Sequence, residues 1–86
     1  MPRALSIQRS IVPSGERAKY FERLKAKQQH YQNAGCQFWV FEEAALTGAF
    51  IEFIEAPSAQ ALSAGHAAAP GMVLDPSRIY TEVELT

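Results

Sequence analysis

The sequence predicts an α+β protein of the ferredoxin-like type, with two helices on one face of a four-stranded antiparallel sheet. Residues 4–12 and 78–85 alternate apolar and polar side chains, as half-buried strands do. Between them lie a long stretch of helical periodicity, an aromatic hairpin and a second helical stretch. The order is therefore β-α-β-β-α-β, in which right-handed crossovers place the first and third strands at the centre of the sheet.

The first strand separates its side chains by type. Leu5 and Ile7 occupy one phase, whereas Ser6 and Gln8 occupy the other. Alternation of this kind is typical of a strand that has one face on the protein core. The pattern breaks at Pro13, which has no backbone N–H to donate to a sheet.

The first helix is expected over residues 15–34, where the chain is also most basic. It ends before Gly35, since glycine readily adopts the left-handed conformation that closes many helices. Its lysines and arginines are not interleaved with aromatic residues suited to stacking on bases, and the net charge of the chain is −1. We therefore expect a solvated helix face and no nucleic-acid partner. One apolar stripe recurs at helical spacing: Tyr20, Phe21, Leu24 and Tyr31.

The remaining elements complete the sheet. Two apolar runs, residues 36–43 and 49–56, form a hairpin around the short connection AALTG. Pro57 and Ser58 open a shorter second helix. Strict alternation over residues 78–85 then predicts the last strand.

The strand phases predict what lies on each face of the sheet, because successive side chains point to opposite sides. We expect the two helices to cover one face and to leave the other open. The residues expected beneath the helices are Leu5, Ile7, Ile51, Phe53, Ile79, Val83 and Leu85. The residues expected on the open face are Ser6, Gln8, Ser10, Phe50, Glu52, Ile54, Tyr80, Glu82 and Glu84.

The hairpin leaves the register of the second strand undecided. A slip of one residue exchanges Trp39 and Phe41 for Phe38 and Val40 on the open face. Either register leaves an apolar patch on the order of several hundred Å², which monomers rarely expose to water. We therefore expect a homodimer in which two sheets meet face to face and bury about 800 Å² per partner.

Length and composition limit the remaining possibilities. The 86 residues are expected to form one domain, residues 1–86. Cys36 is the only cysteine, which excludes an intramolecular disulfide and favours a reducing compartment. No apolar run approaches the ~20 residues that cross a membrane, and MPRALSIQRS lacks the apolar stretch of a signal peptide. We expect a cytoplasmic protein with no membrane partner.

The βαββαβ order, the length of under a hundred residues, the long first helix ending in AGC and the aromatic hairpin resemble the dimeric α/β-barrel proteins. These include the antibiotic-biosynthesis-monooxygenase-like and NIPSNAP-like families. The resemblance is architectural and covers most of the chain. It implies a homodimer whose two sheets enclose a ligand-holding barrel. Relatives oxidise aromatic substrates without metal or flavin, so the resemblance implies no cofactor. Some relatives bind haem through a helix histidine, a position that only His66 could imitate here.

Glu52 is a single charge within an aromatic strand, between Phe50 and Ile54. Small polar groups beside bulky aromatics are the usual composition of a ligand pocket. Glu52 is therefore the candidate catalytic base or hydrogen-bond anchor, unless it only pairs with an arginine or tyrosine across the dimer. The candidate ligand-binding residues are Gln8, Trp39, Phe50, Glu52, Tyr80 and His66.

Three functions fit these features. The first is a small homodimer that binds an apolar or aromatic molecule in a pocket on the sheet face. The second is a cofactor-independent monooxygenase or isomerase for an aromatic or polyketide-like substrate, with Gln8, Glu52, Trp39 and Tyr80 as its polar residues. The third is a structural dimerisation module. We expect no metal site, since the two histidines have no ligand spacing, and no phosphate-binding loop, since the five glycines are scattered.

Overall fold

The computed structural model describes residues 2–71 and 73–85 and confirms the α+β fold. Strand β1 (Ala4–Ile11) is followed by a single 3-10 turn, η1 (Ser14–Glu16), and by helix α1 (Arg17–Asn33). The hairpin consists of β2 (Gln37–Glu42) and β3 (Ala49–Ala56). Helix α2 (Ala59–Ala67) then precedes the short strand β4 (Tyr80–Thr81).

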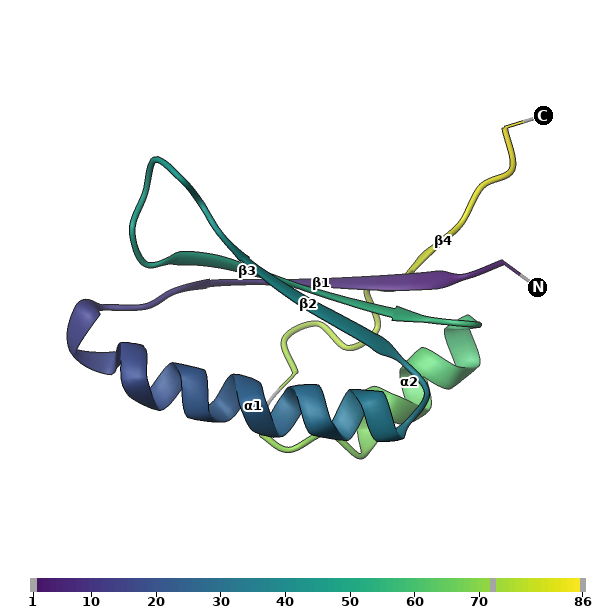
Figure 1. Ribbon diagram of the computed structural model, residues 1–86. Coiled ribbons are helices and arrows are strands. Elements are labelled where there is room, and N and C mark those ends of the chain that lie inside the picture. Colours follow the sequence, from purple (N-terminus) through teal and green to yellow (C-terminus); the bar gives the residue numbers. More distant parts are fainter. Residues whose placement is uncertain (1, 72, 86) are drawn as a thin grey trace.

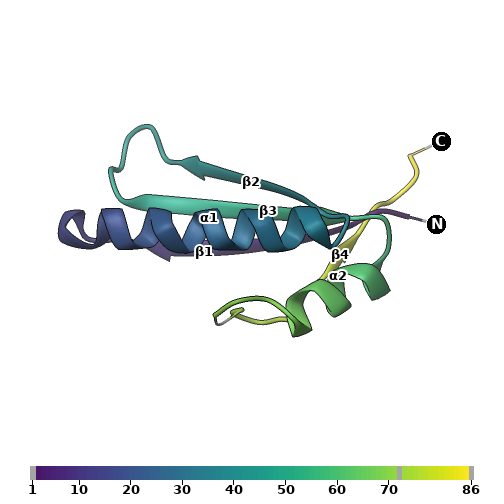
Figure 2. The same cartoon turned by 60° about the horizontal axis from the view of Figure 1, so that its bottom comes forward.

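The four strands form one antiparallel sheet in the order β2-β3-β1-β4, with β1 and β3 in the centre as predicted. Both helices lie on the same side of the sheet (Figure 1). Helix α1 runs along the length of the sheet, while α2 lies at the end nearest the two termini (Figure 2). This arrangement is the ferredoxin-like one, and it leaves the opposite face of the sheet without a covering element.

One glycine ends the first helix and one serine begins the second, as the sequence predicts. Gly35 adopts a φ of +81°, the left-handed conformation that ends α1, and the next residue, Cys36, donates its N–H to the carbonyl of Tyr31. The hydroxyl of Ser58 accepts the N–H of Ala61 at 3.1 Å and so caps α2. These contacts fix where both helices begin or end relative to the sheet.

The core lies between the sheet and the helices. Its main part joins both helices to the three long strands, and Tyr31 stacks on Phe38 with ring centroids 5.9 Å apart. A second part at the hairpin end of α1 joins Tyr20, Phe50 and Val12. The main part contains Ala4, Tyr31, Cys36, Phe38, Ile54, Ala56 and Leu62.

The predicted assignment of strand phases to the two faces is wrong for β1 and β3. Ser6, Glu52 and Ile54 are fully buried on the helix side, whereas Ile7 and Phe53 lie on the open side. The register still places the expected residues opposite one another: Gln8 pairs with Glu52, and Ser6 with Ile54. The two sets were therefore grouped correctly and placed on the wrong sides.

The volumes of the core side chains explain why the two phases of the strands face the sides opposite to those predicted. Tyr20 and Tyr31 of α1 bring two large rings against the sheet, and Phe38 fills more of the same layer. Small side chains at Ala4 and Ser6 of β1 leave room for them, because a core is packed to nearly crystalline density. The large aliphatic phase of β1 consequently points outward.

Strand β2 takes one of the two registers left open above. Phe38 is buried and Val40 is half-buried on the helix side, whereas Trp39 and Phe41 are exposed on the open side. Phe41 meets Phe53 of β3 edge to face, at 5.7 Å between ring centroids. The open side therefore carries the larger aromatic residues of the hairpin.

The last strand is much shorter than predicted. Only Tyr80 and Thr81 pair with β1, and the chain then leaves the sheet. Val83 and Leu85 are 72% and 93% exposed and do not lie beneath the helices, so that expectation is wrong. Ile79 does pack against the core. Strand β1 begins at Ala4; just before it, the carbonyl of Arg3 accepts the N–H of Glu82 at 2.8 Å, and residues 83–85 extend past the sheet.

Candidate functional site

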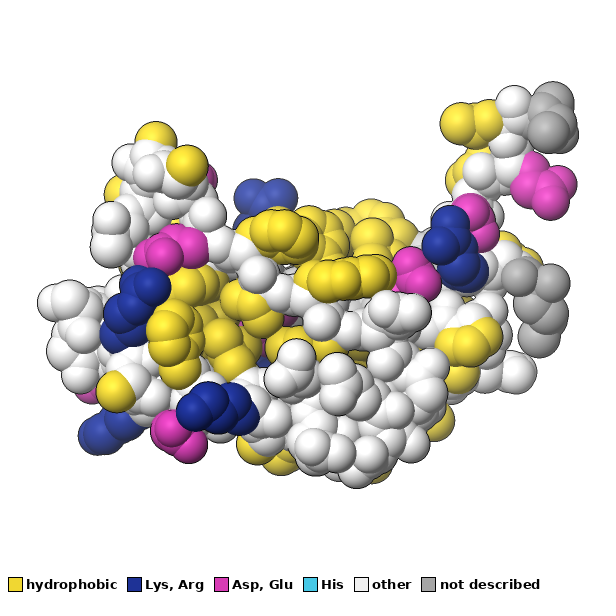
Figure 3. All heavy atoms as spheres, viewed as in Figure 1, with side chains coloured by type: hydrophobic (Ala, Val, Ile, Leu, Met, Phe, Trp, Pro, Cys, Tyr) yellow, Lys and Arg dark blue, Asp and Glu magenta, His cyan; other side chains and the backbone are white. Residues whose placement is uncertain are grey.

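The open side of the sheet carries large apolar side chains that no helix of the described residues covers. Trp39, Phe53 and Ile7 form one row across three strands, and Phe41, Ile51 and Arg9 form the next. Figure 3 shows hydrophobic side chains gathered along the top of the sheet, away from the helices. We call this surface the open face; its members are Leu5, Ile7, Arg9, Ile11, Trp39, Phe41, Ile51, Phe53 and Tyr80.

Two segments project on the same side as the open face. The hairpin connection between β2 and β3 turns away from the helices at one end of the sheet, and residues 82–85 do so at the other (Figure 1). Both carry exposed aliphatic side chains, Leu46 on the first and Val83 and Leu85 on the second. The open face is therefore bordered at both ends by apolar groups that have no partner within the described chain.

A hollow of about 360 Å³ lies at the hairpin end of the open face. We call it the hairpin hollow. Its walls are mostly apolar, and Arg9 supplies the one basic side chain among the described residues that line it. A concave, mostly apolar site with a few polar groups is the usual form of a small-molecule site. The side chains that form its walls are Ile11, Phe41, Leu46, Ala49 and Ile51, with Glu43 at the rim.

The charges near the hairpin hollow differ in how they are paired. Glu42 accepts two hydrogen bonds from Arg17, at 2.8 and 3.1 Å, and a third from the N–H of Gly48. These bonds, led by those of Arg17, lower the pKa of Glu42 to about 2. Arg9 is exposed and forms no ion pair with any residue in 2–71 or 73–85. Its guanidinium is thus available to a ligand.

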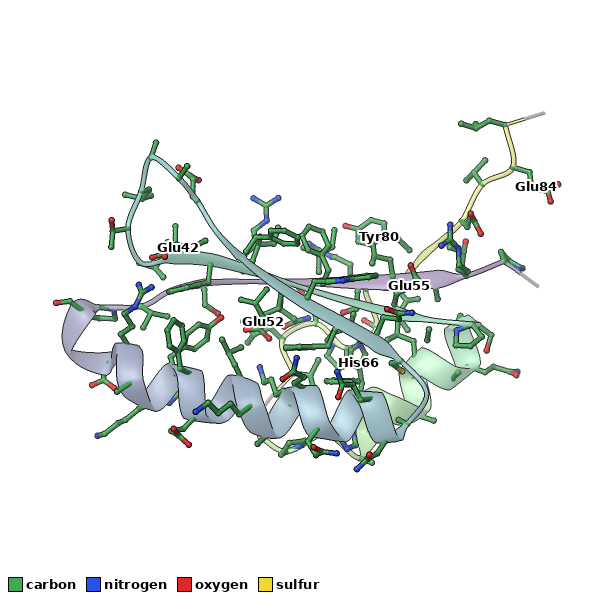
Figure 4. The ribbon with its side chains drawn as sticks, in the orientation of Figure 1. Glu42, Glu52, Glu55, His66, Tyr80 and Glu84 are labelled. Atoms are coloured by element: carbon green, nitrogen blue, oxygen red, sulfur yellow. The ribbon has the colours of Figure 1, made fainter. Side chains whose placement is uncertain are left out.

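Glu52 lies on the other side of the sheet, beneath α1 (Figure 4). It is 1% exposed; its Oε2 accepts a hydrogen bond from the Tyr20 hydroxyl at 2.8 Å, and Lys27 Nζ lies 3.1 Å from Oε1. Burial, followed by the hydrogen bond to Glu52, raises the pKa of Tyr20. The carboxylate therefore joins helix to sheet.

The side chain of Gln8 is also buried and hydrogen-bonded within the protein. Its Nε2 donates to the carbonyl of Leu74 at 2.7 Å, and its Oε1 accepts the N–H of the same residue at 3.0 Å. One side-chain amide thus replaces the pair of backbone bonds that a neighbouring strand would make. It holds the connection that follows α2 against β1, where β4 is absent.

His66 is 6% exposed and packs against α1. Its Nδ1 lies 2.8 Å from the Tyr31 hydroxyl, whereas its Nε2 is buried without a hydrogen-bond partner among the described residues. Burial lowers the pKa of His66 and raises that of Tyr31 to about 12. His66 lies between helices and sheet, on the side opposite the open face (Figure 4).

The six residues predicted for one ligand site therefore fall into separate places. Trp39 and Tyr80 lie on the open face, whereas Gln8, Phe50, Glu52 and His66 are buried on the helix side of the sheet, Gln8 against Leu74 and Glu52 against Tyr20. The hairpin hollow was not predicted. One signal in the sequence could have indicated it: Arg9 is the only charged residue in the phase of β1 that otherwise holds Leu5, Ile7 and Ile11.

No protein-family model matches this sequence, and searches among curated proteins and among solved structures find no significant match. In the part of the chain that the structure describes, neither helix is long and apolar enough to cross a membrane.

Proposed function

We propose that two copies of this chain associate through their open faces and bind a small apolar or aromatic molecule in the hairpin hollow. The observation that carries the proposal is the open face itself. Four aromatic side chains lie on it, and Trp39, Phe41 and Tyr80 are 41%, 57% and 50% exposed in the single chain. Aromatic residues bury about 150–250 Å² each, so the patch exceeds what monomers commonly leave in water.

A second copy is the occupant that this surface fits best. The open face is apolar except for Arg9 near its middle and charged groups at its two ends, and an apolar face of this kind can pair with its own copy about a two-fold axis. The ion pair of Arg3 with Glu82, at 2.7 Å, lies at one end, and Glu43 lies at the other. The hairpin connection and residues 82–85 would flank the partner and bury Leu46, Val83 and Leu85. This arrangement corresponds to the dimeric α/β-barrel architecture that the sequence resembles.

The proposed function is binding rather than turnover. The four polar residues expected to act on a substrate lie on opposite sides of the sheet, with Trp39 and Tyr80 on the open face and Gln8 and Glu52 on the helix side. The hairpin hollow, by contrast, has aromatic and aliphatic walls and is of a size suited to a small molecule.

Light scattering on two matched variants tests the dimer. Phe53→Glu places a charge at the centre of the open face, and Ala26→Glu places the same charge on an exposed residue of α1, away from that face. We expect the wild-type chain and Ala26→Glu to have twice the 9.5 kDa mass of one chain, and Phe53→Glu to be monomeric and folded. A dimeric Phe53→Glu, or a monomeric wild type, would overturn the proposal. In the monomeric case the open face would instead be a surface for a different protein.

A further inference from the structure

We infer that the molecule bound in the hairpin hollow carries an anionic group of the carboxylate type, and that Arg9 binds it. This inference rests on the proposed function and deepens it from an apolar ligand to an aromatic acid. Arg9 lies opposite Ile51 in the β1–β3 register, and Ile51 lies opposite Phe41 in the β2–β3 register. The guanidinium thus shares one row of the sheet with the apolar walls of the hollow.

If a second copy covers the open face, the positive charge of Arg9 needs an anionic partner. A second copy would remove water from the sheet, and a charge transferred from water without a partner is strongly unfavourable. An arginine side chain is tolerated there when a carboxylate or similar anion accepts its two parallel N–H bonds. The hollow therefore requires an anion in addition to an apolar body.

The acids of the same chain do not supply that anion. On the open side of the sheet, Glu55 and Glu82 both bind Arg3, at 3.4 and 2.7 Å. Glu42 is held by Arg17 on the helix side. Asp75, which lines a neighbouring hollow together with Arg9, pairs with Arg78 at 3.8 Å. Glu43 is an exposed residue that lines the hairpin hollow, and the alternative to a ligand is an ion pair of Arg9 with the partner's Glu43.

Two dyes with the same ring system separate these possibilities. The first is 8-anilinonaphthalene-1-sulfonate, an aromatic anion. The second is N-phenyl-1-naphthylamine, which lacks only the sulfonate. Both become fluorescent in apolar surroundings, so titration of each into the wild-type protein, with the mass recorded on the same samples, measures the contribution of the charge alone.

The variants are Arg9→Gln and a control, Lys19→Gln, which removes the same charge from an exposed position on α1. We expect the wild type to bind the anionic dye more tightly than the neutral one. Arg9→Gln should weaken the anionic dye by about 10- to 100-fold, the range for a hydrogen bond to a charged group, and change the neutral dye by less than about threefold. Lys19→Gln should leave both affinities unchanged.

Any other result of the dye titrations contradicts either the proposed function or the role of Arg9. If the wild-type dimer binds neither dye, ligand binding in the hollow fails, and with it the proposed function. If both dyes bind equally and Arg9→Gln alters neither, only the role of Arg9 fails. If Arg9→Gln and Glu43→Gln each weaken the dimer while dye affinities stay the same, Arg9 pairs with the partner's Glu43, which overturns the inference. Equal loss of both dyes in a dimeric Arg9→Gln would overturn it too, since the sulfonate would then be irrelevant.

Discussion

The hydroxyl of Tyr20 donates a 2.8 Å hydrogen bond to Oε2 of Glu52 and so joins the first turns of α1 to the centre of β3. Lys27 reaches the other carboxylate oxygen two turns later, at 3.1 Å. A buried carboxylate destabilises a fold unless it is paired and hydrogen-bonded. These two contacts explain why a glutamate lies in the middle of an aromatic strand: it positions α1 on the sheet.

Tyr20→Phe removes one of these contacts and leaves a buried carboxylate oxygen without its donor. We expect the free energy of unfolding to fall by about 1–3 kcal/mol. The control is Tyr80→Phe, because Tyr80 is half-exposed and its hydroxyl has no hydrogen bond within residues 2–71 and 73–85. Urea unfolding of both variants measures the difference. Equal stabilities for the two variants would show that the Tyr20–Glu52 bond contributes nothing.

Gln8→Leu keeps the approximate side-chain volume and removes both hydrogen bonds to Leu74. We expect the amide hydrogen of Leu74 to exchange with solvent at least about fivefold faster, since a lost hydrogen bond is worth roughly 1 kcal/mol or more. Amides shared by β1 and β3 should keep their protection. NMR-detected hydrogen exchange follows each amide, and Gln60→Leu, at an exposed position on α2, is the control. Unchanged exchange at Leu74 would contradict the role of Gln8.

His66 makes stability depend on pH in a predictable direction. Burial lowers its pKa in the folded chain below the ordinary value of 6.5, so the unfolded chain binds a proton first as pH falls. The stability that neutral His66 contributes is therefore complete above pH 6.5 and decreases below it. Protonation is further opposed because Nε2 has no acceptor among the described residues.

The measurement is the free energy of unfolding at pH 7.5 and 5.5. We expect wild type to lose more stability between these values than His66→Gln, whose side chain can still accept the hydrogen bond of Tyr31. His30→Gln is the control, because His30 is only half-buried, with its Nε2 2.8 Å from the carbonyl of Gly65. If His66→Gln shows the same pH dependence as wild type, His66 does not cause it.

Gly48 holds the hairpin connection against the end of β1. Its φ is +92°, its carbonyl accepts the N–H of Val12 at 2.8 Å, and an added Cβ would lie 2.6 Å from the carbonyl oxygen of Val12. Gly48→Ala should therefore destabilise the fold by about 1–3 kcal/mol and weaken dye binding in the hairpin hollow. Gly15→Ala has open space around its Cβ and should be nearly neutral. Thermal unfolding and a dye titration distinguish the two variants.

The strand order and the pairing of β1 with β3 follow from local patterns that a sequence carries directly. Alternation in β1 and the aromatic run in β3 predict that Gln8 and Glu52 share a face. Which face the helices cover depends on how α1 fills the core. The rings of Tyr20 and Tyr31 occupy the space that larger residues of β1 would need. That is a property of volumes brought together by the fold, so alternation alone could not decide it.

The last strand shows a second limit of sequence patterns. Residues 78–85 alternate strictly, yet only Tyr80 and Thr81 form strand pairs with β1, which begins at Ala4, and one further backbone hydrogen bond joins Glu82 to Arg3. Val83 and Leu85 therefore alternate like strand residues although they lie outside the sheet of the single chain. The place of Arg9 in one row with Ile51 and Phe41 depends in the same way on the register of β2, which the sequence leaves open.

The fluorescence of Trp39 tests the covered open face most directly, because it is the only tryptophan and lies on that face opposite Phe53. It is 41% exposed in a single chain. Acrylamide quenching should be weak and the emission blue-shifted in the wild-type dimer, and Phe53→Glu should restore strong quenching and red-shifted emission. A wild-type dimer whose Trp39 is quenched as readily as that of the monomeric variant would show that the copies meet through another surface, and would contradict the account.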